Sequence, residues 1–435
     1  MEKSAAASKK SLFTKYEVFV IAILGLIQFT VVLDFMVLSP LSDLLLVKLS
    51  ITSAQFTKAV SVYGIAAGFS AFIAASFADK FDRKKLLLFF YTGFILGTLF
   101  CGLAPDYNSL IAARIITGIF GGVLSSISMA IITDIFQMQV RGRVMGFIQM
   151  AFAASQILGI PIGLYLAYHF HWHVPFLMIV GVSIVAFAIV ALKLKPVAEH
   201  LKLKEKKVHP VKHLLNTISN KRYITGFLGT VLLATGGFML MPLAAAFSIN
   251  NLKITPDELT MVYMVTGIFS MIFGPILGKV SDSIGKFRMF LVGSVITIVM
   301  VYIYTNLGVT PVWLVIGVNV LLFVGVTSRM ISSQALISGV PTPQDRGAFM
   351  SVNSSIQYLS GGIASFASGL LTYQDKTTKV FQHYNYLGYA VIGSMIVCAL
   401  MMYFINRMVN RGGLEIPKHV QKEEVAAQVI PEYKK

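Results

Sequence analysis

Long apolar stretches alternate with short polar breaks along most of this sequence. A helix needs about 20 apolar residues to cross the roughly 30 Å hydrocarbon layer of a bilayer, and such stretches recur from Tyr16 to near Arg407. The pattern predicts an all-α polytopic membrane protein with twelve transmembrane helices. The expected spans are 16–39, 56–78, 86–104, 109–133, 144–168, 173–192, 223–248, 259–280, 288–307, 311–337, 347–373 and 386–408.

One polar interruption is much longer than the others and divides the spans into two sets of six. It covers 193–222 and is rich in Lys and Arg, which suit the anionic headgroups of a cytoplasmic membrane surface. A docking site for a partner protein is the alternative. The predicted organisation is an N-terminal tail (1–15), a six-helix bundle (16–192), a basic linker (193–222), a second bundle (223–408) and a C-terminal tail (409–435).

Composition and charge agree with a membrane protein. Only 13% of the residues are charged, against about 25% in soluble domains. The net charge of +17 could suggest a nucleic-acid partner, but its distribution follows the positive-inside rule if the N-terminus is cytoplasmic. We therefore expect a bacterial inner-membrane protein with both termini in the cytoplasm and no nucleic-acid partner. The basic residues outside the expected cytoplasmic segments are Lys48, Lys58, Lys253, Lys376 and Lys379 in external loops, and Arg114 and Arg329 within helices.

The two halves carry matching landmarks at nearly the same spacing. The loop after the second span contains Asp79, and the loop after the eighth contains Asp282, 203 residues later. Weak internal repetition is typical of transporters built from two related bundles. The other matched landmarks are Arg141 and Arg346 after the fourth and tenth spans, and Pro40 and Pro242 at the outer ends of the first and seventh.

These loops resemble the signature of the major facilitator superfamily, G-x-L-a-D-r-x-G-r-k, and the resemblance extends over essentially the whole chain. In the first copy Ala75 and Asp82 replace the two glycines of the pattern. The resemblance implies two pseudo-symmetric six-helix bundles that alternate access around a central cavity lined by helices one, four, seven and ten. It also implies a cytoplasmic latch for the outward-open state, formed by Asp79, Arg83, Lys84, Asp282, Gly285, Lys286, Arg141 and Arg346.

Two oppositely charged residues are expected at similar depth in the membrane. Asp34 lies in the outer half of the first span, and Arg114 lies about one turn into the fourth. A charge within the bilayer is costly and marks a functional site by default. A carboxyl balanced between burial, which favours its neutral form, and a neighbouring Arg, which favours its charged form, can take up and release protons. The alternative is that the two residues form a structural ion pair.

Small residues continue the Arg114 face of the fourth span at helical spacing: Gly118, Gly121, Ser125 and Ser128. This stripe resembles the family motif R-x-x-x-G, which in proton-driven drug exporters lies near an acid of the first helix and is tied to proton transfer. The resemblance therefore implies proton coupling through Asp34 and Arg114.

A third intramembrane charge, Arg329, lies in the tenth span with Ser332 and Ser333 on the same helical face. A guanidinium beside hydroxyls suits an anionic or hydroxylated group, and the resemblance places the tenth helix at the cavity. The alternative is that Arg329 extends toward the cytoplasmic interface. The polar residues Gln28, Asn353 and Gln357 in other apolar spans are further candidates for the substrate cavity.

The fifth span contains Gly159, Pro161 and Gly163, which allow a bend and close packing against helix eight. The segment resembles a shortened form of the family's antiporter motif, and more closely the version found in arabinose-efflux and sugar-efflux permeases. A bend with no bearing on transport direction is the alternative.

No enzyme or ATPase motif stands out. A Walker-type phosphate loop is missing from the sequence, and the alternating His169, His171 and His173 suit headgroup anchors better than a metal site. We expect no cofactor and no metal. The predicted function is efflux of a small organic solute or drug-like compound by a monomeric multidrug-type antiporter in exchange for protons. The alternatives are an uptake symporter or facilitator for a small organic anion, and a membrane enzyme or sensor that does not transport.

Overall fold

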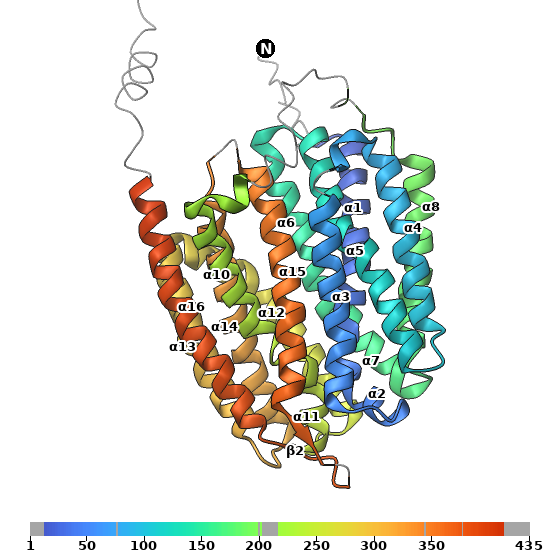
Figure 1. Cartoon of the computed structure of the whole chain (residues 1–435), viewed down its shortest axis with the longest axis vertical. Helices are drawn as coiled ribbons and strands as arrows, with labels where there is room; N and C mark the ends of the chain where they lie inside the picture. Colours follow the sequence, from blue (N-terminus) through green and yellow to red (C-terminus); the bar gives the residue numbers. More distant parts are fainter. Residues whose placement is uncertain are drawn as a thin grey trace, which may run out of the picture.

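The computed structural model describes residues 13–74, 77–198, 201, 216–342, 345–375 and 377–412. Nearly all of them form long helices that run side by side (Figure 1). In the first half these are α1 (Lys15–Val37), η1 (Ser39–Leu41), α2 (Ser42–Lys48), α3 (Ser53–Ala74), η2 (Ala78–Lys80), α4 (Arg83–Gly102), α5 (Tyr107–Ile135), α6 (Met138–Ala154), the π-helical turn η3 (Ser155–Gly159), α7 (Ile160–His169) and α8 (Val174–Lys193).

The second half repeats this plan and adds a short hairpin. Its elements are α10 (Lys221–Phe238), η5 (Met241–Leu243), α11 (Ala244–Asn250), α12 (Pro256–Ile284), α13 (Lys286–Asn306), α14 (Val312–Ser338), α15 (Arg346–Leu371), β1 (Tyr373–Gln374), β2 (Phe381–Gln382) and α16 (Tyr384–Gly412). Most of the linker predicted at 193–222, and most of both predicted tails, lie outside the described residues.

Ten of the twelve predicted spans correspond to segments that, within the described residues, are long and apolar enough to cross a membrane. The other two fall short for different reasons. The span predicted at 144–168 is divided among α6, η3 and α7, because the π-helical turn interrupts the regular helix. The span predicted at 347–373 is one continuous helix, α15, but its many serines and its Asn353 and Gln357 make it too polar.

The internal repeat is visible in the first helix of each half. Helices α1 and α10 each end in a 3₁₀ turn and a short helix, η1–α2 and η5–α11. Pro40 and Pro242 are the second residues of the two 3₁₀ turns, where the missing proline N–H does not disturb a helix. The matched prolines of the sequence therefore mark equivalent breaks at the same end of both bundles.

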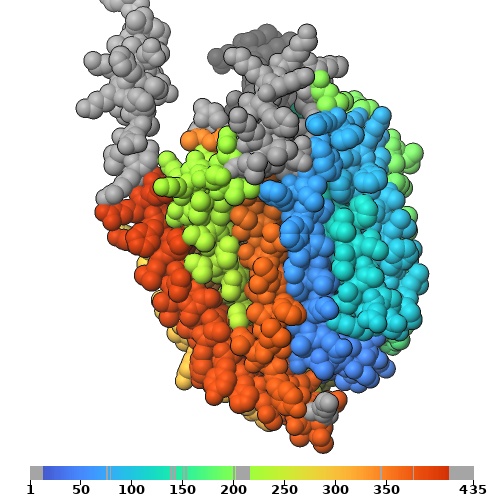
Figure 2. Space-filling view, viewed as in Figure 1, coloured from blue at the N-terminus to red at the C-terminus, as the bar shows by residue number. Residues whose placement is uncertain are grey.

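We call the end of the molecule where α1 begins and α16 ends the terminal face, and the opposite end the distal face (Figure 1). The two halves touch along two seams: α3 against α15 on one side, and η3 and α7 against α12 on the other. Figure 2 shows α3 and α15 as adjoining blue and orange surfaces without a gap over most of their length. Side chains on the outside of the helices are largely apolar, as a lipid-facing surface requires.

The distal ends of the two halves are also joined. The Ala246 N–H donates to Ser42 Oγ (3.0 Å), and Asn250 Nδ2 donates to Asp43 Oδ1 (2.6 Å), so α11 is bonded to α2. We call these two contacts the distal gate. Nearby, the side chain of Asn251 donates to Phe381 O and accepts from Phe381 N, both at 2.9 Å, which fastens the hairpin to the second half.

Candidate functional site

Asp34 and Arg114 form an ion pair in the interior of the first bundle. Arg114 Nη1 lies 2.9 Å from Asp34 Oδ2, and both side chains are 0% exposed. The same Nη1 also donates to the main-chain oxygen of Asp34 (3.1 Å), while Thr98 Oγ1 donates to Asp34 Oδ1 (3.1 Å). Three helices, α1, α4 and α5, therefore meet at one carboxylate.

The glycines of α5 allow α3 to cover this pair. A Cβ on Gly118 would lie 2.5 Å from the Tyr63 main-chain oxygen, and one on Gly121 would lie 2.7 Å from the Tyr63 hydroxyl. Tyr63 can therefore place its ring over the Arg114 guanidinium, with the Arg114 Cζ 4.4 Å from the ring centroid. Such a cation–π contact is stronger when both groups are removed from water.

A second polar contact joins the same two helices. Ser125 Oγ donates to Gln28 Oε1 (3.1 Å), so the predicted stripe on α5 meets α1 again at Ser125. Tyr358 of α15 lies close enough to Ser125 for their side chains to interact. This polar group therefore includes a residue from each half.

Arg329 lies inside the second bundle. Its Cζ is 5.6 Å from the centroid of the Phe290 ring on α13, and its guanidinium is within hydrogen-bonding reach of the Cys398 sulfur on α16. The residue is 4% exposed. Its Nε and Nη2 atoms have no hydrogen-bond partner among the described residues. The side chain is directed toward the outer helices of its own bundle.

The other predicted cavity residues make short contacts within the second bundle. Thr230 Oγ1 donates to Asn353 Oδ1 (2.6 Å), which connects α10 and α15. Ser332 Oγ lies 3.2 Å from Ser281 Oγ of α12, and Ser333 Oγ donates to Met330 O. Gln357 is half-buried on α15.

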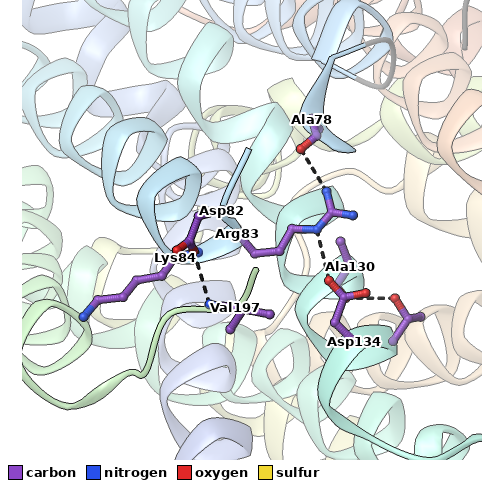
Figure 3. Close-up of polar contacts among 8 residues, drawn as sticks. Ala78, Asp82, Arg83, Lys84, Ala130, Asp134 and Val197 are labelled. Atoms are coloured by element: carbon purple, nitrogen blue, oxygen red, sulfur yellow. Dashed lines mark hydrogen bonds and ion pairs between the residues drawn. The ribbon is translucent and has the colours of Figure 1, made fainter. Parts of the chain in front are cut away.

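The first signature loop is held by a partner that was not among the predicted residues. Arg83 Nε lies 3.2 Å from Asp134 Oδ2 near the end of α5, and Arg83 Nη1 donates to Ala78 O (3.0 Å; Figure 3). The available signal for Asp134 was an acid in the last turn of a mainly apolar helix whose other charged residue is Arg114. Lys84 is directed away from this pair and donates to Ala191 O.

The second signature loop contains an ion pair of its own. Lys286 pairs with Asp282 inside its own loop, and Gly285 between them has a φ of 95°, a conformation that favours glycine. Arg346 is exposed at the start of α15. The side chains of Asp79 and Arg141 lie outside the described residues. The ion pair described for the first copy, Arg83–Asp134, thus joins the loop to α5, whereas the pair described for the second copy lies within the loop.

Asp82 replaces a glycine of the family pattern and attaches the start of the linker to α4. Its Oδ1 accepts from the Lys84 N–H (2.8 Å) as the N-cap of α4 and also from the Val197 N–H (3.2 Å). The Arg83 N–H donates in return to Val197 O (3.0 Å). The chain that leaves α8 is therefore bound to the first signature loop.

Asp82→Ala is expected to lower the free energy of unfolding by about 1 kcal/mol, because α4 loses its N-cap, and to speed tryptic cleavage after Lys193. Thermal unfolding in detergent and limited proteolysis would measure these effects. Asp82→Asn is the matched control, because asparagine caps a helix as well as aspartate and still accepts from Val197. Equal behaviour of the two variants would contradict this role for Asp82.

The predicted bend in the fifth span is present as the π-helical turn η3 followed by Pro161 near the start of α7. Its two glycines do not face α12, however, which contains the predicted eighth span. A Cβ on Gly159 would meet Leu33, and one on Gly163 would meet Val37, both on α1. The close approach to α12 is made instead by the backbone at Ile157, opposite Gly267. The reason is that the π-helical turn rotates the glycines toward α1.

The predicted histidine cluster lies on the distal face. His171 Nδ1 and His173 Nδ1 are 2.6 Å apart, and His173 Nε2 lies 2.8 Å from Ala104 O. Burial and the neighbouring His173 lower the pKa of His171. No group of three or more His, Cys, Asp or Glu side chains that could hold a metal ion occurs among the described residues.

Comparison with known proteins identifies similar proteins over nearly the whole chain. The family model described as Major Facilitator Superfamily matches residues 24–365 and 226–428. The MFS-type transporter YceJ of Bacillus subtilis, itself uncharacterized, is 24% identical over 388 residues, which cover 89% of this chain and 95% of YceJ. The bicyclomycin resistance protein homolog of Haemophilus influenzae is 24% identical over 367 residues, covering 80% of this chain and 86% of that protein.

Solved structures with a similar fold have low sequence identity. A bacterial homolog of the human lysosomal transporter Spinster, in an inward-facing and occupied conformation, matches with a TM-score of 0.70 at 13% identity, over 91% of this chain and 98% of that one. The Escherichia coli xylose transporter XylE matches with a TM-score of 0.68 at 15% identity, over 90% and 98% of the two chains. These likenesses establish the fold.

Proposed function

This chain belongs to the major facilitator superfamily of membrane transporters, and on that basis we propose that it exports a small organic solute or drug-like compound in exchange for protons. Asp34 and Arg114 are the proton-coupling pair in this proposal. The terminal face and both chain ends are cytoplasmic, and the membrane is the bacterial inner membrane.

The observation that carries the proposal is the complete burial of the Asp34–Arg114 pair. A proton can reach a carboxylate with 0% exposure only when the surrounding helices move. Protonation also removes the negative charge that holds Arg114, so the contact between α1 and α5 depends on the protonation state. Proton uptake and helix movement are therefore linked in both directions, as exchange transport requires.

Two further observations favour export. The H. influenzae relative is named as a bicyclomycin resistance protein homolog, and resistance is a usual result of drug efflux. The rival proposal, uptake of an organic anion, needs Arg114 and Arg329 as ligands. Arg114 is bonded to Asp34, lies under the Tyr63 ring and is 0% exposed, so a solute cannot reach it in this state. Its Nε and Nη2 atoms, like those of Arg329, have no hydrogen-bond partner among the described residues. The Nε and Nη2 atoms of Arg329, which have no partner among the described residues, are the observation that favours the anion proposal.

The remaining residues have the following places in the proposal. Gln28, Arg329, Ser332, Ser333, Asn353 and Gln357 contribute to substrate binding, directly or by fixing the helices around it. The Arg83–Asp134 pair, with Asp79, Lys84, Arg141, Asp282, Gly285, Lys286 and Arg346, belongs to the cytoplasmic latch. The bend at Gly159, Pro161 and Gly163 allows the fifth span to follow α1. The active unit is a monomer.

Everted membrane vesicles with an imposed pH gradient test the proposal, with ethidium and a panel of other fluorescent drug-like compounds as probes. We expect at least one probe to accumulate, and both a protonophore and Asp34→Asn to abolish the accumulation. Asp106→Asn is the matched control, because this exposed acid caps α5 and asparagine also caps helices. Accumulation that needs no proton gradient, or that survives in Asp34→Asn, would contradict proton exchange.

A further inference from the structure

Phe35 follows Asp34 directly in α1 but is directed out of the first bundle. Successive residues of a helix are rotated by about 100°, so Asp34 faces α4 and α5 while Phe35 faces the second half. Its ring centroid is 5.6 Å from that of Phe238 on α10 and 6.2 Å from that of Tyr358 on α15, both in edge-to-face geometry. Phe35 is therefore a direct contact between the two bundles.

Phe35 is also linked to the charge pair through Tyr63. The two ring centroids are 5.3 Å apart, and the face of the Tyr63 ring lies against the Arg114 guanidinium. In addition, Arg114 Nη1 donates to the main-chain oxygen of Asp34, one residue before Phe35. A movement of Arg114 thus reaches Phe35 by two routes, through the Tyr63 ring and through the α1 backbone.

Tyr63 lies beside a close contact between the two bundles. The next residue, Gly64, is so near α15 that an added Cβ would lie 3.0 Å from Tyr358 O and 3.1 Å from Gly362 Cα. The Tyr63 side chain contacts the charge pair, while the backbone beside it contacts the opposite half. These aromatic groups lie between the charge pair and the α3–α15 seam.

We propose that Phe35 is the positioning residue that transmits the protonation state of Asp34 to the second bundle and so couples it to the distal gate. The inference rests on the proposed proton exchange and adds the route of the coupling. When Asp34 is protonated, Arg114 loses its partner and shifts, and the Tyr63 ring and the α1 backbone shift with it. The edge-to-face contacts of Phe35 with Phe238 and Tyr358 change with this shift, and through them the separation of α2 from α11 depends on whether Asp34 is protonated.

The groups around Asp34 make it the site of the pH response. The titratable side chains near it are Arg114 on α5, Tyr63 on α3 and Cys101 on α4. Arginine stays protonated and tyrosine and cysteine stay neutral at ordinary pH. The fifth span also packs on this part of α1, through Gly159 and Gly163. Neither glycine has a side chain that titrates.

A pair of spin labels across the distal gate tests the proposal. Lys48 at the end of α2 and Asp257 at the start of α12 are exposed, so Lys48→Cys and Asp257→Cys can carry the labels. The two native cysteines, Cys101 and Cys398, are buried and can remain. The full-length protein in lipid nanodiscs would be measured across a pH series, with the infrared band of the protonated Asp34 carboxyl recorded in parallel.

We expect the label distance to change with pH in the otherwise wild-type protein and to be independent of pH in Asp34→Asn. In Phe35→Ala the carboxyl should still titrate, but the pH-dependent change of distance should be lost. Phe35→Tyr should restore it. The matched control is Phe29→Ala, which removes the same ring from α1 and should keep the wild-type response, because none of the described ring contacts joins Phe29 to the second half.

The outcomes separate this inference from the function on which it rests. A normal pH response of the gate in Phe35→Ala would overturn the role of Phe35, and so would loss of the Asp34 titration in that variant. Equal responses of the wild type and Asp34→Asn would overturn proton coupling itself. If Phe35→Ala does not fold, Phe238→Leu tests the same contact from the second bundle and should also uncouple the gate from pH.

Discussion

Arg114→Met is expected to lower the free energy of unfolding by about 3–5 kcal/mol, the range measured when one partner of a buried ion pair is removed. The variant leaves Asp34 with 0% exposure and without its cation, with only the Thr98 hydroxyl as a hydrogen-bond donor from another side chain. Methionine is close to arginine in length and apolar, so most of the packing is kept. Chemical denaturation in detergent micelles would measure the loss, and proton-driven transport should fall to background.

The double variant Asp34→Asn with Arg114→Met separates the charge from the packing. Replacing both members of a buried pair is often nearly neutral for stability, so we expect the double variant to be more stable than Arg114→Met alone. Transport should remain at background in both, because neither retains the Asp34–Arg114 pair whose protonation is coupled to transport in the proposed mechanism. A double variant less stable than the single one would show that the pair is not the source of the loss.

Gly362→Val is expected to abolish transport by blocking the α3–α15 seam. A Cβ at this position would lie 2.9 Å from both Ile65 N and Ser61 O, and these are backbone atoms that cannot rotate away. Overpacking of this kind costs about 1–3 kcal/mol, and here it also alters the surface on which the two bundles move. Proton-driven accumulation in everted vesicles would measure the effect.

Gly393→Val is the control for this variant. Gly393 lies on α16 with open space around it, so the same side chain can be added without contact. We expect transport and thermal stability close to those of the wild type. Similar activity in the two glycine variants would mean that the seam has more freedom than its packing indicates.

The positions of the helices and the charge pair could be predicted from the sequence for simple physical reasons. The thickness of the hydrocarbon layer sets the length of a span, so ten of the twelve spans show this length and hydropathy. Asp34 and Arg114 are opposite charges at the same depth, and a low-dielectric interior favours their pairing. The matched prolines likewise mark breaks in the helices because proline cannot continue a regular hydrogen-bond ladder.

The direction of side chains around each helix was much harder to predict. Many of these helices are apolar on all sides, so the sequence does not indicate which face meets a neighbour. Arg329 illustrates this, because its helix could present it to a cavity, an interface or the bundle interior, and the structure places it against Phe290 and Cys398. The bonds of Asp82 and Asp134 depend on chain segments far away in the sequence, which no local pattern reveals.

The two hydrogen bonds between the Asn251 side chain and the Phe381 main chain determine which parts of the distal face move together. Because both main-chain groups of Phe381 are bonded to one side chain that follows α11, the hairpin is carried along when α11 swings away from α2. In the proposed export cycle, a solute leaving on this side therefore meets an opening whose rim is rigid on the second half. An antibody fragment that gripped the hairpin and α2 together would hold the exit shut.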